Sequence, residues 1–233
     1  DASCDWSSDV CSSDLIAKKD ESNMKLFYGE YIGHDVDLVL TTRELERMIK
    51  MSHISSDALK DVECDKLMKD VTGAGVIFGV TGGVMEAALR SAYYLITNKN
   101  PDPDAFKIVR GNTQTKGWAS AEIDIDGITV KAAVVNGLGN TRLLIEALEK
   151  GEVKYDFVEA MACPGGCVGG GGQPIHDGYE LATERGKTLY KLDSNAKIRF
   201  SHENQDVITM YKEYFEKPLS VKSHMILHTD HNA

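Results

Sequence analysis

The segment that decides how this chain folds is Glu159-Ala-Met-Ala-Cys-Pro-Gly-Gly-Cys-Val-Gly-Gly-Gly-Gly-Gln-Pro174, the most glycine-rich stretch of its 233 residues. Cys163 and Cys167 lie inside it, separated by three residues. A disulfide between such near neighbours would be strained and would close almost no loop. Glycines permit positive φ angles and let backbone N–H groups approach an anionic group, which favours a thiolate-ligated iron–sulfur centre. The spacing alone is only moderately specific, and zinc sites favour shorter gaps.

Short apolar runs alternate with helical patterns on both sides of this segment, which is typical of an α/β fold with a mostly parallel sheet flanked by helices. Residues 155–158 predict the strand that delivers the cysteine loop, because sites commonly form at strand carboxyl ends. Residues 121–126 and 128–135 predict a β-hairpin that leads into a buried strand. The remaining expected elements are a buried strand at 37–40 and helices at 43–51, 84–97 and 141–150, the first with a capping box formed by Thr41 and Glu44.

The composition favours a soluble, cytoplasmic protein. The formal net charge of −10 and the pI near 5.2 argue against nucleic acid and anionic membranes as partners. No apolar run is long enough to span a bilayer, and no secretory signal is visible. Five scattered cysteines do not form a disulfide framework, which fits a reducing compartment.

With its flanks, the segment Glu-x-Met-Ala-Cys-Pro-Gly-Gly-Cys-x-Gly-Gly-Gly-x-Gln-Pro resembles the third cluster-binding motif of the [FeFe]-hydrogenases. The resemblance implies an H-cluster, in which a [4Fe–4S] cubane is bridged to a two-iron site that carries CO and CN ligands. By position, Cys163 binds the cubane, and Cys167 binds the cubane and bridges to the two-iron site. Met161 falls on the family's methionine beside the two-iron site, and Gly165 and Gly166 are expected to contact the cluster.

Ile16-Ala-Lys-Lys-Asp-Glu21 resembles the end of the same family's second motif, Met-Pro-Cys-x-x-Lys-x-x-Glu. The resemblance gives Lys18 the role of the lysine that hydrogen-bonds a cyanide ligand, and Glu21 that of the motif glutamate. The motif cysteine falls on Leu15, which cannot ligate iron. Without the third motif, a solvated basic pair at a helix start would be the preferred interpretation of Lys18 and Lys19.

Residues 1–15 differ in composition from the rest of the chain and lack apolar periodicity. Their string DWSSDVCSSDL resembles a translated sequencing adapter, so we interpret them as a disordered artefact joined within the second motif. Cys4 and Cys11 are therefore not expected to be ligands, and acidic neighbours favour a structural thiol at Cys64. The family's first motif does not occur in the sequence, so we expect the chain as given to lack two cluster cysteines and to be inactive.

The run from Gly73 to Arg90 contains many glycines but does not fit a nucleotide-binding loop. It lacks the lysine of a P-loop, and its glycines do not follow the dinucleotide-binding pattern. It resembles instead the hydrogenase segment whose Phe-Gly pair packs against the two-iron site, which implies that role for Phe78 and Gly79. As a core aromatic residue, Phe78 would look the same from composition alone.

From Lys197 the chain resembles the small-subunit-like tail that is fused to the catalytic domain in some hydrogenases, an arrangement that also indicates the cytoplasm. Three histidines lie near the end of the chain: His224, His228 and His231. They could suggest a metal site, but no cysteine or carboxylate completes a ligand set, so a solvated or packing role is favoured. We therefore divide the chain into an artefact at 1–15, part of the catalytic domain at 16–196 and a helical tail at 197–233.

The resemblance implies one lobe of the two-lobed catalytic domain of an anaerobic enzyme that catalyses 2H⁺ + 2e⁻ ⇌ H₂. Implied partners are ferredoxin or NAD(P)-linked electron-transfer subunits and the hydrogenase maturation proteins, with accessory Fe–S clusters only upstream. A first alternative is a non-catalytic cluster-assembly factor, which keeps cubane cysteines but loses two-iron-site residues such as Met161 and Lys18. A second is a hydrogen sensor, which an appended regulatory domain would distinguish.

Overall fold

The computed structural model describes residues 17–29, 33–34, 36–63, 71–110, 117–176, 179 and 181–227. The expectations for residues 1–15, Cys64, His228 and His231 lie outside these residues. The helices are α2 (Ala17–Glu21), α3 (Thr42–Met51), α4 (Gly73–Val76), α5 (Gly83–Thr97), α6 (Leu138–Glu149), α7 (Ala182–Asn195), α8 (Gln205–Met210) and α9 (Val221–Leu227). The strands are β1 (Tyr28–Gly29), β2 (Gly33–His34), β3 (Trp118–Ile125), β4 (Ile128–Asn136) and β5 (Phe157–Met161). Shorter turns include η3 (Ile77–Gly79), η5 (Cys167–Gly169) and the π-helical η7 (Tyr211–Phe215), which continues α8.

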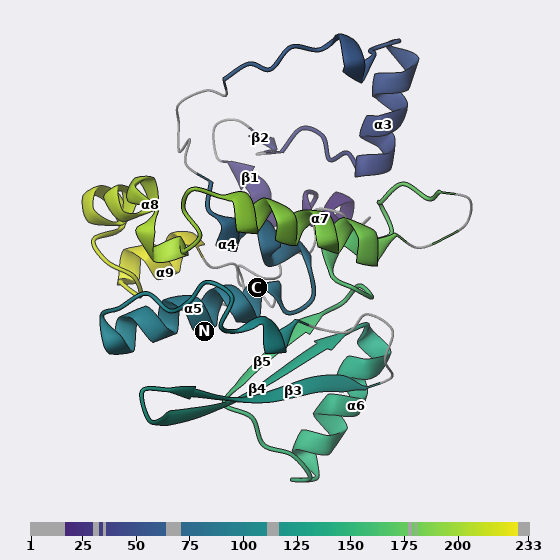
Figure 1. Cartoon of the computed structure of the whole chain (residues 1–233). Coiled ribbons are helices and arrows are strands. Elements are labelled where there is room, and N and C mark those ends of the chain that lie inside the picture. The colour runs from purple at the N-terminus through teal and green to yellow at the C-terminus, as the bar shows by residue number, and fades with distance from the viewer. Residues whose placement is uncertain are drawn as a thin grey trace.

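The main sheet has the order β3-β4-β5 (Figure 1). Strands β3 and β4 form an antiparallel hairpin whose turn residues, Asp126 and Gly127, both have positive φ, as two-residue hairpin turns prefer. Strand β5 lies parallel to β4, with Val134 opposite Glu159. The predicted hairpin and the α/β class are confirmed. The sheet itself is mixed, with one antiparallel and one parallel pair, and not mostly parallel as expected, because the hairpin supplies two of its strands.

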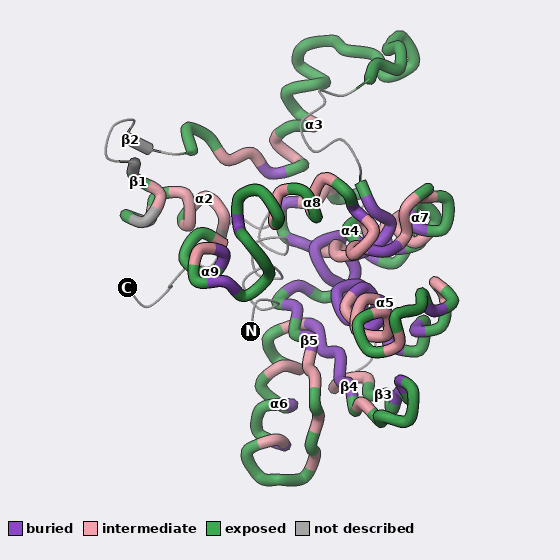
Figure 2. Tube along the Cα trace, turned by 90° about the vertical axis from the view of Figure 1, so that its left-hand side faces the viewer, coloured by how far each residue is buried: buried purple, intermediate pink, exposed green. Residues whose placement is uncertain are grey.

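Helices α5 and α6 cover opposite faces of this sheet (Figures 1 and 2). Alternate residues of a strand point to opposite faces. Ala132 and Val134 of β4 therefore share a buried cluster with Met85 and Leu89 of α5, while the intervening residues face α6. Burial of each large apolar side chain contributes about 1.5–3 kcal/mol. This packing fixes the start of α5 near the end of β5.

The segment 37–40 corrects one prediction. Instead of a buried strand it is irregular, and Leu38 is 70% exposed. An apolar run forms a strand only where a neighbouring strand accepts its backbone hydrogen bonds, and the described part of the sheet offers 37–40 no such partner. The helix that follows agrees with the sequence, because Thr41 and Glu44 form the predicted capping box.

A buried ion cluster joins α5, α7 and the start of the C-terminal segment. Arg90 is fully buried and donates to Glu86 at 2.8 Å and to Asp193 at 2.9 Å. Arg110 donates to the Glu86 carboxylate at 2.7 Å, and Arg199 donates to Asp193 at 2.6 Å. Each buried carboxylate therefore has two guanidinium partners, which offsets the cost of removing these charges from water.

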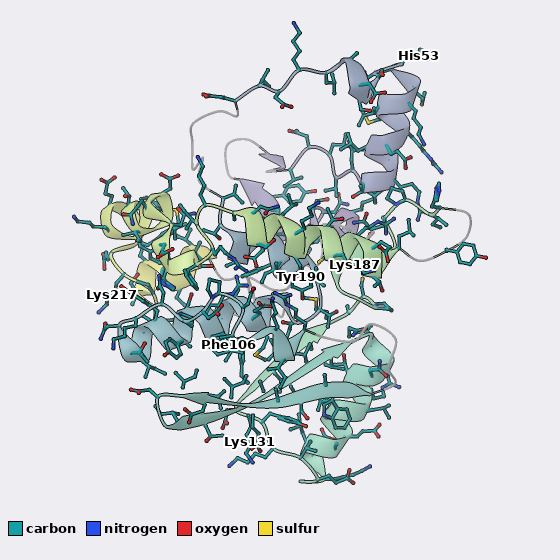
Figure 3. The ribbon with its side chains drawn as sticks, in the orientation of Figure 1. His53, Phe106, Lys131, Lys187, Tyr190 and Lys217 are labelled. Atoms are coloured by element: carbon teal, nitrogen blue, oxygen red, sulfur yellow. The ribbon has the colours of Figure 1, made fainter. Side chains whose placement is uncertain are left out.

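Helix α7 also contacts this cluster through an aromatic ring. The guanidinium of Arg110 lies 3.9 Å from the ring centroid of Tyr190, which Figure 3 labels on α7. Helices α8 and α9 lie beside α5 at the end of the described chain (Figure 1). Among the described helices, none has the length and apolar character needed to cross a membrane.

Candidate metal centre

The loop that follows β5 holds the two cysteines and is shaped by glycine. Gly165 and Gly166 have φ angles of 83° and 93°, a region that glycine adopts without strain. The Gly166 N–H donates to the Cys163 carbonyl at 3.0 Å, and the Gly170 N–H donates to the Cys167 carbonyl at 2.9 Å. The loop encloses both thiols, since Cys163 is 9% exposed and Cys167 is 3% exposed.

The turn before α5 packs directly against this loop. A Cβ atom on Gly166 would lie 2.8 Å from the Gly79 carbonyl oxygen and from the Thr81 nitrogen, and 3.0 Å from the Met161 sulfur. The Thr81 N–H donates to the Gly165 carbonyl at 3.1 Å. Glycine is therefore required at position 166 by close approach as well as by φ. The predicted site residues that meet here are Met161, Gly79, Gly165 and Gly166.

Two buried polar side chains that the sequence analysis missed hold these segments together. Glu159 of β5 accepts hydrogen bonds from the Gly82 N–H and, at 2.7 Å, from the Met85 N–H. A side chain of the sheet therefore caps the N-terminus of helix α5. Burial raises the pKa of Glu159 to about 7, although the helix amides lower it. Asn136, at the end of β4, accepts a hydrogen bond from the Gly165 N–H at 3.1 Å.

One signal could have identified Glu159 in advance. It lies two residues before Met161 on the same strand, so the two side chains share one face. Both are buried, at 5% and 1% exposure. A charged residue on the apolar face of a strand indicates a specific buried partner. No local pattern marks Asn136, because its partner is 29 positions away in the chain.

The residues around the loop are suited to an iron–sulfur group, which binds thiolates and whose sulfur atoms accept hydrogen bonds. Thr81 is fully buried, and its hydroxyl has no hydrogen-bond partner among the described residues. Buried polar atoms in folded proteins are almost always paired, so this hydroxyl fits a partner outside the described residues, such as a bound group. Two thiolates are half of the ligand set of a [4Fe–4S] cubane. Within the described part of the chain, no cluster of three or more His, Cys, Asp or Glu side chains forms a complete metal site.

Phe78 lies on a neighbouring surface. It is half-buried and lines an apolar cavity of about 500 Å³ between α5 and the C-terminal segment. Val84, Tyr211 and Leu219 line the same cavity. Gly79, the next residue, turns its carbonyl toward Gly166. The Phe-Gly pair therefore joins this cavity to the cysteine loop.

Lys18 and Glu21 lie on α2, and both are half-buried. The adjacent Lys19 donates to Glu44 of α3 at 2.7 Å. Helix α3 in turn binds the end of the glycine-rich loop, because the Arg43 N–H donates to the Gly172 carbonyl at 2.9 Å and its guanidinium donates to the Gln173 carbonyl at 2.6 Å. Helix α2 is thus linked through α3 to the segment that follows Cys167.

Comparison with known proteins agrees with this arrangement. The family model "Iron only hydrogenase large subunit, C-terminal domain" matches residues 15–171, and the model "Iron hydrogenase small subunit" matches residues 179–233. The NADP-reducing hydrogenase subunit HndD of Solidesulfovibrio fructosivorans is 44% identical over 84% of this chain and 33% of its own length. The chain thus spans about a third of this curated relative.

Solved structures and a more distant relative complete the comparison. A structure of an [FeFe]-hydrogenase from Chlamydomonas reinhardtii has a TM-score of 0.72 and 36% identity, covering 92% of this chain and 60% of that chain. The cytosolic Fe-S cluster assembly factor narfl of Xenopus tropicalis is 28% identical over 93% of this chain and 45% of its own length. The identity is therefore higher to hydrogenases than to assembly factors. With the family model covering most of its length and the fold shared, the chain belongs to the iron-only, or [FeFe]-, hydrogenase family.

Proposed function

We propose that Cys163 and Cys167 supply two thiolates to an H-cluster, in a protein that catalyses 2H⁺ + 2e⁻ ⇌ H₂. The observation that carries the proposal is the close packing of Met161 and Gly79 against the glycine turn between two buried thiols. A chance Cys-x-x-x-Cys on a loop would not require both cysteines to be enclosed. Membership of the hydrogenase family indicates that the group bound by these residues is an H-cluster.

The chain's own residues have separate tasks in this proposal. Cys163 would hold the cubane, and Cys167 would hold the cubane together with the two-iron site. Lys18 would donate a charge-assisted hydrogen bond to a cyanide ligand, and Glu21, the glutamate of the same motif, lies on the same helix. When bound, the H-cluster supplies the redox chemistry, while the polypeptide ligates it, orients it and excludes water.

Residues beside the cysteines make the site dry and closely packed. The Met161 side chain, at 1% exposure, is buried at the end of β5 beside Gly166. Gly79 would allow close backbone approach to the two-iron site, and Phe78, which lines the neighbouring apolar cavity, would exclude water from that side. A low local dielectric strengthens every hydrogen bond to the charged cluster.

The electron partner in this proposal is ferredoxin or an NAD(P)-linked subunit, and maturation proteins insert the two-iron unit. Similarity to an NADP-reducing hydrogenase subunit of Solidesulfovibrio fructosivorans supports the NADP-linked choice. The protein acts in the cytoplasm under anaerobic conditions. The small-subunit match from residue 179 supports fusion of that segment to the catalytic domain.

The proposal is tested in a restored protein, in which residues 17–233 of this chain follow an added segment that carries the family's first motif and the second motif with its cysteine. After anaerobic reconstitution and addition of a synthetic two-iron cofactor, hydrogen evolution from reduced methyl viologen is measured. We expect turnover in the restored protein, and background rates from the 233-residue chain alone, which has only Cys163 and Cys167 as motif cysteines.

Two outcomes separate the proposal from the assembly-factor alternative. A restored protein that binds a cubane but never evolves hydrogen would contradict the enzymatic function and favour a non-catalytic relative. Lys18→Ala is expected to lower retention of the two-iron unit while leaving the spectrum of the cubane unchanged. The matched control is Lys19→Ala, because the Lys19 side chain pairs with Glu44 and is not assigned to the cluster.

A further inference from the structure

Thr81 holds a hydroxyl for which the described polypeptide offers no partner. The residue is fully buried, and its Oγ1 atom forms no hydrogen bond with any described residue. Its backbone N–H is paired, since it donates to the Gly165 carbonyl at 3.1 Å. A buried hydroxyl in that state destabilises the fold unless another group pairs with it.

The position of Thr81 indicates which group that is. A Cβ atom on Gly166 would lie 2.8 Å from the Thr81 nitrogen, so Thr81 touches the backbone between the two cysteines. On one side the chain continues to Gly82, whose N–H is held by Glu159. Thr81 is therefore held by its own N–H and by that of Gly82, and its side chain has no exposure to solvent. Gly166 lies between Cys163 and Cys167, which are both buried, so Thr81 lies against the loop that carries the two proposed ligands.

Other threonines show that this state is specific to Thr81. Thr72, also buried at 7% exposure, accepts a hydrogen bond from the Gly75 N–H at 3.1 Å and caps α4. Thr41 caps α3 in the same way. These hydroxyls have a structural task within the polypeptide. Thr81 is thus the exception among the buried threonines of the described chain.

We infer that Thr81 is a positioning residue whose hydroxyl donates a hydrogen bond to a sulfur atom of the group held by Cys163 and Cys167. The inference rests on the proposed function, because it needs that group to be bound. Hydrogen bonds to the sulfurs of an iron–sulfur centre stabilise its reduced, more negative form and raise its reduction potential. Thr81 therefore sets the potential at which electrons enter the site.

The first part of the test uses the metal-free 233-residue chain and thermal unfolding. Thr81→Val keeps the shape of the side chain and removes a hydroxyl that has no protein partner, so the thermal midpoint should stay the same or rise. The matched control Thr72→Val removes a helix cap, and its midpoint should fall by about 2–4 °C. A fall for Thr81→Val equal to that of Thr72→Val would mean that the Thr81 hydroxyl has a role in the polypeptide alone, and would overturn the inference.

The second part uses the restored protein with its cluster and measures the midpoint potential of the cubane by redox titration followed with electron paramagnetic resonance. Thr81→Val should shift the potential to a more negative value and remove one exchangeable deuteron coupled to the cluster. Thr81→Ser, which keeps the hydroxyl, should restore both, and Thr72→Val should change neither. Equal potentials in the unsubstituted protein and Thr81→Val would overturn the inference while leaving the proposed function intact. A restored protein without any cluster would overturn both.

Discussion

Helix α3 and the cysteine loop are stabilised in different ways. Figure 2 shows α3 among exposed and intermediate residues, whereas the segment around α4 and the start of α5 is buried. No residue of α3 is buried, and Leu45 and Met48 are about half exposed. The cysteine loop is held by hydrogen bonds and close contacts from segments far away in sequence, including Asn136 of β4 and Thr81. Local signals suffice for α3, but the site depends on tertiary packing.

This difference predicts which substitutions the chain tolerates. Around the loop, a single added methyl group meets backbone atoms that cannot move aside. On the exposed side of α3, as at Met48, a larger change meets mostly solvent. Five substitutions test this contrast, and they are given in order of expected effect.

Gly83→Ala should have the largest effect. A Cβ atom there would lie 1.7 Å from the Ile77 carbonyl oxygen, so η3 and the start of α5 would have to separate. We expect a loss of more than about 4 kcal/mol in the free energy of unfolding, or no folding at all, measured by urea denaturation. Gly139→Ala in α6, where a Cβ atom would meet nothing within 4 Å, is the control and should stabilise the helix by about 0.5–1 kcal/mol. A Gly83→Ala protein as stable as the unsubstituted chain would contradict the close packing at the start of α5.

Arg90→Met should cost about 3–5 kcal/mol, because it leaves the carboxylates of Glu86 and Asp193 buried with one partner fewer. Urea denaturation at neutral pH gives the value. The control is Lys187→Met, which removes an exposed ion pair with Glu184 on the outer surface of α7 (Figure 3) and should change stability by less than about 0.5 kcal/mol. Similar losses for the two variants would show that the Arg90 cluster is not shielded from water.

Glu159 should make stability depend on pH. Its pKa in the folded protein is about 7, above the 4.5 of an unperturbed glutamate, so the folded state binds the proton more tightly. Its contribution is therefore full below pH 4.5 and is lost as pH rises through 7, approaching roughly 3 kcal/mol. In denaturation series across this range, Glu159→Gln should lose that slope, whereas the exposed Glu149→Gln should keep it. Parallel pH curves for Glu159→Gln and the unsubstituted chain would refute the role of burial.

Substitutions on α3 should have the smallest effects. Thr41→Ala removes the capping box and should cost about 1 kcal/mol. Met48→Ala should cost less than about 0.5 kcal/mol, because this side chain is 49% exposed. Urea denaturation measures both. Replacing a buried methionine by alanine costs about 2–5 kcal/mol. A loss in that range for Met48→Ala would show that the apolar face of α3 is buried against another part of the protein.

The elements that the sequence predicted well are those with local signals. The capping box of α3, the hairpin turn at Gly127 and the strand before the cysteine loop all depend on residues close in sequence. That strand runs from Phe157 to Met161, two to three residues later than predicted. Helix α6 also formed, although it begins at Leu138 and not at Thr141. The predicted strand at 37–40 was wrong because strand formation depends on a distant neighbour.

The candidate site divides in the same way. The glycine-rich motif identified the cysteine loop, and with it Met161, Gly165 and Gly166. Glu159, Asn136 and Thr81 were not identified, because their role comes from contacts across 29 to 84 positions of the chain. The buried cluster around Arg90 was missed for the same reason, since Asp193 lies 103 positions away.

The most direct test of the account is whether Cys167 ligates both halves of the cofactor. In the restored protein, iron content, the electron paramagnetic resonance of the reduced cubane and hydrogen evolution are measured for Cys167→Ser beside Cys64→Ser, which changes a cysteine outside the motif. We predict that Cys167→Ser loses the two-iron unit and all turnover, while Cys64→Ser keeps both. Full turnover in Cys167→Ser would contradict the assignment of the buried thiols as cluster ligands.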